Sequence, residues 1–201
     1  ANRSATHLLH AALHHHVGRH VTQKGSLVDD KRLRFDISQP TPLSDDDIVN
    51  IEAQVNQRIR RNAEVTTRLM TPQEAVDAGA MALFGEKYGD EVRVVAMGGH
   101  DDGNREYSVE LCGGTHVRRT GDIGLFKIIS ESALASGVRR VEGVTGAGAL
   151  AYLAEQDKRL QAAAATLKSS PAEVVERVQS LMDDRKRLEK EVAELRRQVA
   201  L

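Results

Sequence analysis

Apolar residues recur at two different periods along the chain, and the change between them divides the sequence near residue 145. Up to Thr145, short alternating runs, glycine-rich turns and a few helical stretches follow one another. Beyond Gly148 glycine and proline almost disappear, and apolar positions recur every three or four residues, as is typical of α-helices. The pattern predicts an α+β domain over residues 1–145 and a helical segment over residues 146–201.

The helical segment predicts two heptad-bearing helices that fold back as an antiparallel hairpin. Between them, Ser169, Ser170 and Pro171 supply an N-cap and a first-turn proline. If the chain turns near Pro171, Asp157 and Arg185 lie opposite each other, and we expect them either to pair across the seam or to reach solvent at a loosely packed end. A heptad seam can also close between chains, so self-association through residues 149–201 stays open. The two seams are Leu150, Leu153, Asp157, Leu160, Ala164 and Leu167, then Val174, Val178, Leu181, Arg185, Leu188, Val192, Leu195 and Val199.

The first 145 residues predict strands and helices that alternate irregularly, with the short spacings of β-hairpins. This order favours an α+β fold in which helices cover a mixed or antiparallel sheet. Helices are expected over Ser4–Val17, from Ser44 to about Arg61, and from Pro72. Strands are expected at Val21–Val28, Arg32–Ile37, Val65–Leu69, Val92–Met97, Tyr107–Leu111, Leu125–Ser130 and Val138–Val144.

Composition excludes several classes of protein. Lys and Arg number 28 against 29 Asp and Glu, so a general polycation that coats nucleic acid or membrane is excluded. Aromatic residues make up 3% of the chain, which argues against base stacking on aromatic platforms. A single cysteine excludes an internal disulfide framework and fits a reducing compartment. With no long apolar run or signal segment, we expect a soluble, cytoplasmic protein without a membrane partner. Because the chain lacks an initiator Met and ends inside a helical pattern, we expect it to be a piece of a longer protein.

The single cysteine stands in a sequence that can carry chemistry. Cys112 and His116 are separated by two glycines and a threonine, so thiolate and imidazole can reach one metal ion. Taken alone, this pair is half a site, and Cys112 could equally be a small buried apolar residue. The other half would come from the histidine-rich first helix, where His7 and His10 lie one turn apart. A single helical histidine is more often structural, so the sequence leaves both readings open.

At this point the chain resembles a known family, the editing domain of bacterial alanyl-tRNA synthetases. The resemblance covers essentially the whole chain, including the helical segment, which is similar to the linker that follows that domain. Free-standing alanyl-tRNA deacylases and the threonyl-tRNA synthetase editing domain share its His-x-x-x-His and Cys-x-x-x-His signature. The segments that carry it are Ser4–Leu13, Gln23–Val28, Arg34–Asp36, Gly79–Tyr88, Cys112–His116 and Thr120–Gly124.

The resemblance implies hydrolysis of the ester that joins serine or glycine to the 3′ end of alanine tRNA, whose acceptor end would be the partner. The pocket in which a synthetase attaches alanine to tRNA cannot strongly reject a smaller amino acid or one with an extra hydroxyl. A second site therefore hydrolyses the wrongly charged tRNA. Nothing in the sequence resembles an ATP-binding or amino-acid-activation site, so the ligase reaction would lie elsewhere in the full-length protein.

The resemblance also implies a zinc site, with one departure. His7, Cys112 and His116 correspond to metal ligands of the family, but Arg3 stands where the family has its first histidine. Arginine has only donors and cannot ligate a metal. Three readings follow: water completes the coordination of one Zn²⁺, His10 substitutes, or zinc is weak or absent and Arg3 supplies positive charge to a phosphate or carbonyl oxygen.

Further roles follow from the resemblance residue by residue. Thr6 is similar to a residue that gates the pocket by size and by contact with a substrate hydroxyl, although it could simply bond locally within its helix. Gln23 is similar to the residue that positions substrate or water, and Asp36 is a nearby carboxylate that could instead belong to a turn. The expected substrate and tRNA contacts are Arg3, Lys24, Asp36, Gly113, Gly114, Thr115, Arg118, Arg139 and Arg140.

Two other functions compete with the editing hydrolase. In the first, Arg3 has disabled the metal site, and the chain is a non-catalytic tRNA-binding or dimerisation module. A deacylation assay with and without a chelator separates these cases. The second, a general zinc hydrolase, is disfavoured because the His-Glu-x-x-His arrangement is missing.

Overall fold

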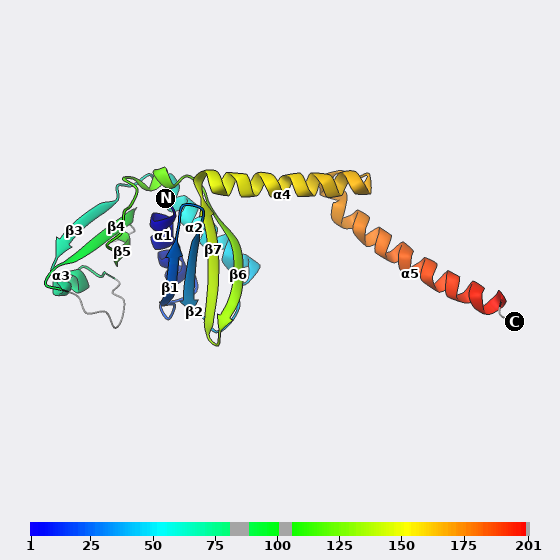
Figure 1. Cartoon of the computed structure of the whole chain (residues 1–201), viewed down its shortest axis with the longest axis horizontal. Helices are drawn as coiled ribbons and strands as arrows, with labels where there is room; N and C mark the ends of the chain where they lie inside the picture. The colour runs from blue at the N-terminus through cyan, green and yellow to red at the C-terminus, as the bar shows by residue number, and fades with distance from the viewer. Residues whose placement is uncertain (81–88, 101–105, 200–201) are drawn as a thin grey trace. The chain divides into compact units, whose positions relative to one another are not determined.

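The computed structural model describes residues 1–80, 89–100 and 106–199 (Figure 1). Residues 81–88, within the Gly79–Tyr88 motif, therefore lie outside the described residues. The chain divides into two compact units, Ala1–Leu150 and Ala151–Leu201. This division falls inside helix α4 (Gly146–Leu167), whereas the domain boundary that we propose, between residues 145 and 146, precedes that helix.

The first unit contains two antiparallel sheets, which confirms the predicted α+β class. The four-stranded sheet has the order β1 (Gln23–Val28), β2 (Leu33–Ser38), β7 (Val138–Thr145) and β6 (Phe126–Ala135). The three-stranded sheet consists of β3 (Thr66–Met70), β4 (Val92–His100) and β5 (Glu106–Leu111). Strand β6 extends past its predicted end at Ser130 because it stays paired with β7 as far as the turn at Gly137, whose φ is +70°.

Helix α1 (Asn2–His16) is the centre of this unit. Residues Ser4–Leu13 are all buried, so the helix has no solvent face over that stretch. Its apolar side chains share one core with Phe35 of β2, Met97 of β4 and Tyr107 of β5. Figure 1 shows α1 lying between β1 and the three-stranded sheet. Polar residues of α1 are therefore forced into the protein interior, where each needs a partner.

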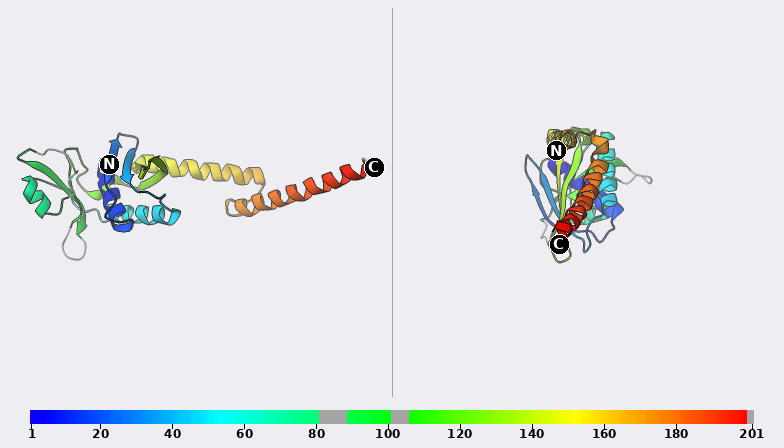
Figure 2. Two further views of the ribbon diagram at one scale, coloured as in Figure 1. Left: turned by 90° about the horizontal axis from the view of Figure 1, so that it is seen from below. Right: turned by 90° about the vertical axis from the view of Figure 1, so that its right-hand side faces the viewer.

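Helix α2 (Asp45–Arg60) begins where the sequence predicts. Ser44 Oγ accepts the backbone N–H of Asp47, and the Asp47 carboxylate accepts the backbone N–H of Ser44, which forms a capping box. The helix contacts both α1 and β6 (Figure 2). Its Asn56 side chain bonds the backbone N–H and C=O of Phe126, both at 2.9 Å, and thereby ties α2 to β6.

Two short helices complete the first unit. Helix α3 (Pro72–Asp77) starts with a capping box made by Thr71 and Glu74, as the proline at its first position predicts. The 3₁₀-helix η1 (Thr120–Ile123) follows the Cys112–His116 loop, and Thr120 Oγ1 donates to the C=O of Arg58 at 2.9 Å. These contacts join the loop region to the end of α2.

The second unit contains the two predicted helices, the main part of α4 and α5 (Val174–Val199), separated by the 3₁₀-helix η2 (Pro171–Glu173). The predicted packing of these helices into a hairpin is not seen in the described residues and stays a prediction. Helix α5 has no buried residue, and seam residues such as Leu181 and Leu188 are 44% and 50% exposed. Arg185 pairs with Glu189 at 3.4 Å rather than with Asp157, because a partner one turn away on the same helix needs no packing of the two seams.

Within the described residues, no helix combines the length and apolar character needed to cross a membrane.

Candidate metal centre

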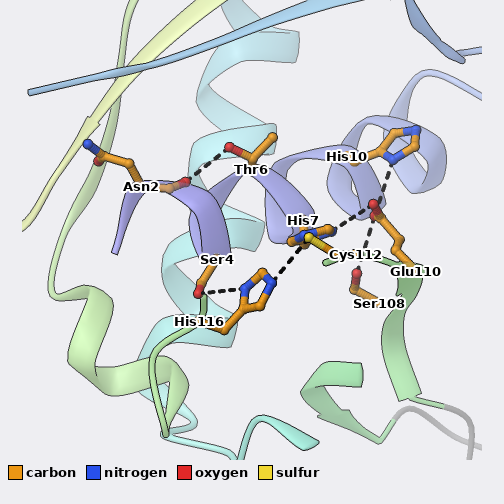
Figure 3. A network of polar contacts seen from close by, with 9 residues as sticks. All are labelled: Asn2, Ser4, Thr6, His7, His10, Ser108, Glu110, Cys112 and His116. Carbon is orange, nitrogen blue, oxygen red and sulfur yellow. Dashed lines mark hydrogen bonds and ion pairs between the residues drawn. The ribbon is translucent and has the colours of Figure 1, made fainter. Parts of the chain in front are cut away.

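Three potential metal ligands converge on one point of the first unit. His7 comes from the buried helix α1, whereas Cys112 and His116 come from the loop that follows β5. Their ligand atoms all lie within 4.8 Å of one another (Figure 3). At residue 114 the loop passes so close to the Arg3 side chain that a Cβ there would overlap it.

Both imidazoles are held through Nδ1, which leaves Nε2 for the cluster. Nδ1 of His7 donates to Oε2 of Glu110 at 2.7 Å, and His7 also hydrogen-bonds the Cys112 sulfur. Nδ1 of His116 lies 3.1 Å from Oγ of Ser4, and its Nε2 lies 3.3 Å from Sγ of Cys112. The two rings therefore face the same sulfur with the nitrogen that a metal would need.

This donor set fits zinc. Imidazole nitrogen and thiolate sulfur are ligands that Zn²⁺ prefers, and a catalytic site has three protein ligands and one open position. Tetrahedral ligands at ordinary zinc bond lengths lie roughly 3.3–3.6 Å apart. The separation of 3.3 Å between His116 Nε2 and Cys112 Sγ falls in that range. Carboxylate and hydroxyl groups behind the imidazoles are the outer partners that such ligands usually have.

Electrostatics favour the ligand form of the sulfur. Hydrogen bonds with His116 and His7 lower the pKa of the Cys112 thiol to about 5. Burial lowers the pKa of His7, but hydrogen bonds with Cys112 and Glu110 outweigh burial and raise that pKa to about 9. Burial raises the pKa of Glu110, but hydrogen bonds from His10 and His7 outweigh it, so the net shift is downward. At neutral pH these shifts favour a Cys112 thiolate paired with a protonated His7, so the sulfur is already in its metal-binding form, and metal binding would release the second proton of His7.

His10 lies outside the ligand group. Its Nδ1 donates to Oε1 of Glu110 at 3.1 Å, whereas His7 bonds the other carboxylate oxygen (Figure 3). Its Nε2 is buried and has no hydrogen-bond partner among the described residues. The geometry therefore does not support the reading in which His10 replaces a ligand.

Arg3, the residue in place of the expected first histidine, lies beside the cluster. Its side chain contacts Gly114, and it is exposed to solvent. It has no hydrogen bond or ion pair among the described residues, so its positive charge is available to a ligand at the edge of the cluster.

The hydrogen bonds and strand pairing of three further predicted site residues lie outside this cluster. These residues are Thr6, Gln23 and Asp36. Thr6 Oγ1 donates to the C=O of Asn2 at 3.0 Å, and its side chain points away from the cluster (Figure 3). Gln23 opens β1, where it pairs with Ile37 of β2. The buried Asp36 carboxylate is bidentate with Arg140, at 2.7 and 3.0 Å. Thr6 therefore bonds locally within its helix, whereas Asp36 lies within β2 rather than in a turn and pairs with Arg140 of β7, 104 residues away.

The basic residues fall into two groups. Arg139 and Arg140 already have partners: Arg140 pairs with Asp36, and Arg139 makes two bonds of 2.5 and 2.6 Å with Glu131. Lys24 and Arg118 are exposed and, within the described part of the chain, have no carboxylate partner. Gly113 and Thr115 are exposed in the loop of the cluster.

Sequence reasoning missed Ser4 and Glu110. Glu110 stands two residues before Cys112, and residues two apart in a strand point to the same face. Ser4 stands three residues before His7, one turn away on the same helix. Both spacings are visible in the sequence. They do not identify Glu110 or Ser4 as a partner of a histidine, however, until α1 is known to lie against β5.

Comparisons with known proteins show what this chain is similar to. Residues 92–142 match the family described as the threonyl and alanyl tRNA synthetase second additional domain. The chain is 60% identical over 202 residues to the alanine–tRNA ligase of Parvibaculum lavamentivorans and 61% identical over 203 residues to that of Rhizorhabdus wittichii. It is 59% identical over 201 residues to that of Granulibacter bethesdensis. Each alignment covers 100% of this chain but 23% of the relative, so the chain spans about a quarter of their length. Over its whole length, the chain therefore resembles the part of bacterial alanyl-tRNA synthetase that comprises the editing domain and the helical linker after it.

Proposed function

We propose that this chain hydrolyses the ester between a wrong amino acid, serine or glycine, and the 3′ end of alanine tRNA, as the editing part of an alanine–tRNA ligase. The observation that carries the proposal is the convergence of His7, Cys112 and His116 in a chain similar to alanine–tRNA ligases from end to end. The competing non-catalytic module requires a degenerate site. Three ligand atoms within 4.8 Å of one another, despite Arg3, argue against that degeneration.

His7, Cys112 and His116 would hold one Zn²⁺, with the fourth position open to water or substrate. A bound zinc ion supplies Lewis acidity, which polarises a carbonyl group and lowers the pKa of water. The protein's own part is to hold the two imidazoles and the thiolate in place and to position the ester beside them.

Arg3 is the first candidate for positioning the ester. Its exposed guanidinium beside Gly114 lacks a carboxylate partner among the described residues, and a guanidinium can donate two parallel hydrogen bonds to a phosphate. We assign it the terminal phosphate or the ester carbonyl of the tRNA end. Gly113, Gly114 and Thr115 would line the same edge.

Lys24 and Arg118 would extend this contact along the acceptor end, because both are exposed and lack a carboxylate partner in the described chain. Arg139 and Arg140 would first have to exchange Glu131 and Asp36 for a phosphate. For this reason we rank these two arginines behind the three cations that are already available.

Thr6 and Gln23 are proposed to act on substrate choice and on positioning. Gln23 can only hydrogen-bond, because an amide is no general base at neutral pH. Thr6→Val removes the hydroxyl with little change of volume. If Thr6 recognises the hydroxyl of serine, this variant should slow hydrolysis of seryl-tRNA more than that of glycyl-tRNA, whereas equal effects on both would remove Thr6 from recognition.

The experiment that tests the function measures hydrolysis of seryl and glycyl alanine tRNA by the purified chain and two site variants. Cys112→Ala and His116→Asn should slow hydrolysis on the order of 100-fold or more, since a metal supplies several kcal/mol to such a reaction. His100→Asn is the matched control, because His100 is exposed on β4 and pairs with Glu106 outside the cluster. Wild-type rates in Cys112→Ala would overturn the assignment of the site.

A further inference from the structure

Glu110 is a buried carboxylate that bridges two histidines of α1. It is 7% exposed, and its two oxygens receive different imidazoles: Oε2 takes Nδ1 of His7 at 2.7 Å, and Oε1 takes Nδ1 of His10 at 3.1 Å (Figure 3). A third, longer contact comes from Ser108 Oγ at 3.4 Å. The carboxylate therefore has all its polar contacts inside the protein.

The secondary structure explains this arrangement. Alternation along β5 places Ser108 and Glu110 on one face, and Cys112 follows at the same spacing. His7 and His10 are three residues apart and so share one face of α1. The carboxylate of Glu110 and the sulfur of Cys112 therefore lie next to the face of α1 that carries the two imidazoles.

An ionised carboxylate accepts hydrogen bonds and cannot donate them. Both imidazoles must therefore carry a proton on Nδ1. For His7, this leaves Nε2 as the atom that faces Cys112, with the ring held from behind. For His10, the bond to Glu110 is the polar contact of the ring, since its buried Nε2 has no partner among the described residues.

We propose that Glu110 is the positioning residue of the metal centre: it fixes the ring orientation and proton position of His7, and His10 anchors Glu110 from the other side. This inference rests on the proposed function, because it concerns the same cluster. It adds two residues, Glu110 and His10, that act on the ligand and do not touch the metal.

The test is the zinc affinity of Glu110→Gln, measured by competition with a chromophoric chelator. Glutamine keeps the shape of the side chain but offers one acceptor oxygen for two N–H donors. Loss of such an outer partner typically weakens metal binding roughly 10–100-fold, and we expect a loss in that range. Ser108→Ala is the matched control, because it removes the 3.4 Å contact and leaves both imidazoles on the carboxylate. Its zinc affinity should equal that of the wild type.

A second measurement needs no variant and therefore decides the case if Glu110→Gln fails to fold. In wild-type protein, ¹⁵N NMR of the imidazoles should detect slowly exchanging Nδ1–H groups on both His7 and His10. A ring of either histidine with its only proton on Nε2 would overturn the proposal.

Failure of this inference and failure of the proposed function are distinguishable. If the wild-type chain binds zinc and Glu110→Gln binds it equally well, the inference alone is wrong. If the wild-type chain binds no zinc, the proposed function loses its metal, and the role of Glu110 as a metal-positioning residue falls with it.

Discussion

At the scale of single residues, the sequence predicted the three residues that converge in the cluster and missed the groups that hold them. Cys112 and His116 were recognisable because their spacing lets both reach one ion, and His7 followed from a resemblance. Glu110 and Ser4 were invisible because their partners are 103 and 112 residues away in the chain. Glu110 and Ser4 bond these histidines because α1 is buried. The burial of a whole helix cannot be predicted from two residues.

Gly114 offers a direct test of the position of Arg3. In Gly114→Ala the new methyl group would overlap the Arg3 side chain, so the guanidinium must move and hydrolysis of seryl alanine tRNA should slow. Gly113→Ala is the matched control, since a Cβ there meets nothing within 4 Å. If Gly114→Ala slows hydrolysis as strongly in an Arg3→Ala background as in the wild type, the effect does not run through Arg3.

Cys112 gives a prediction about pH. Its thiol pKa of about 5 lies below the ordinary value of 9.0, so in zinc-free protein the thiolate forms as pH rises through about 5. Alkylation by iodoacetamide should therefore reach its plateau near neutral pH. The same shift favours the folded state at neutral pH, and this contribution is lost as pH falls toward 5. An alkylation rate still rising between pH 8 and 9 contradicts the shift.

At the scale of elements, local signals were reliable where a helix or strand end depends on its own residues. Ser44 and Asp47 form the predicted cap of α2, and the Ser170–Pro171 signal separates the helical segments as expected. The hairpin stays a prediction because packing of two seams depends on distant surfaces. Heptad spacing shows that α4 and α5 have apolar seams but does not identify the surface that covers them.

Asn56 tests the join between α2 and β6. Asn56→Ala leaves the backbone N–H and C=O of Phe126 without their partner, and we expect a loss of about 2–4 kcal/mol in the free energy of unfolding. Asn50→Ala, at an exposed position of the same helix, should change it by less than about 0.5 kcal/mol. Urea unfolding of both variants measures the difference. Equal stabilities would contradict a role of Asn56 in holding α2 against β6.

At the scale of the whole molecule, the site exists because a buried helix is packed against a strand that is far away in sequence. The near-zero net charge leaves any tRNA contact to local cations, and among the predicted contact residues Arg3, Lys24 and Arg118 have no carboxylate partner in the described chain. Arg139 and Arg140 are paired with Glu131 and Asp36, so their predicted contact with tRNA would require an exchange of partners. Self-association through residues 149–201 stays a prediction.

The most direct test of the metal-dependent editing function is the rate of seryl alanine tRNA hydrolysis by the wild-type chain, first stripped of metal by a chelator and then reloaded with Zn²⁺. The three-ligand centre predicts that stripping abolishes hydrolysis and that one equivalent of Zn²⁺ restores it. Full activity of the stripped chain, or no activity after one equivalent of Zn²⁺ has bound, would contradict it.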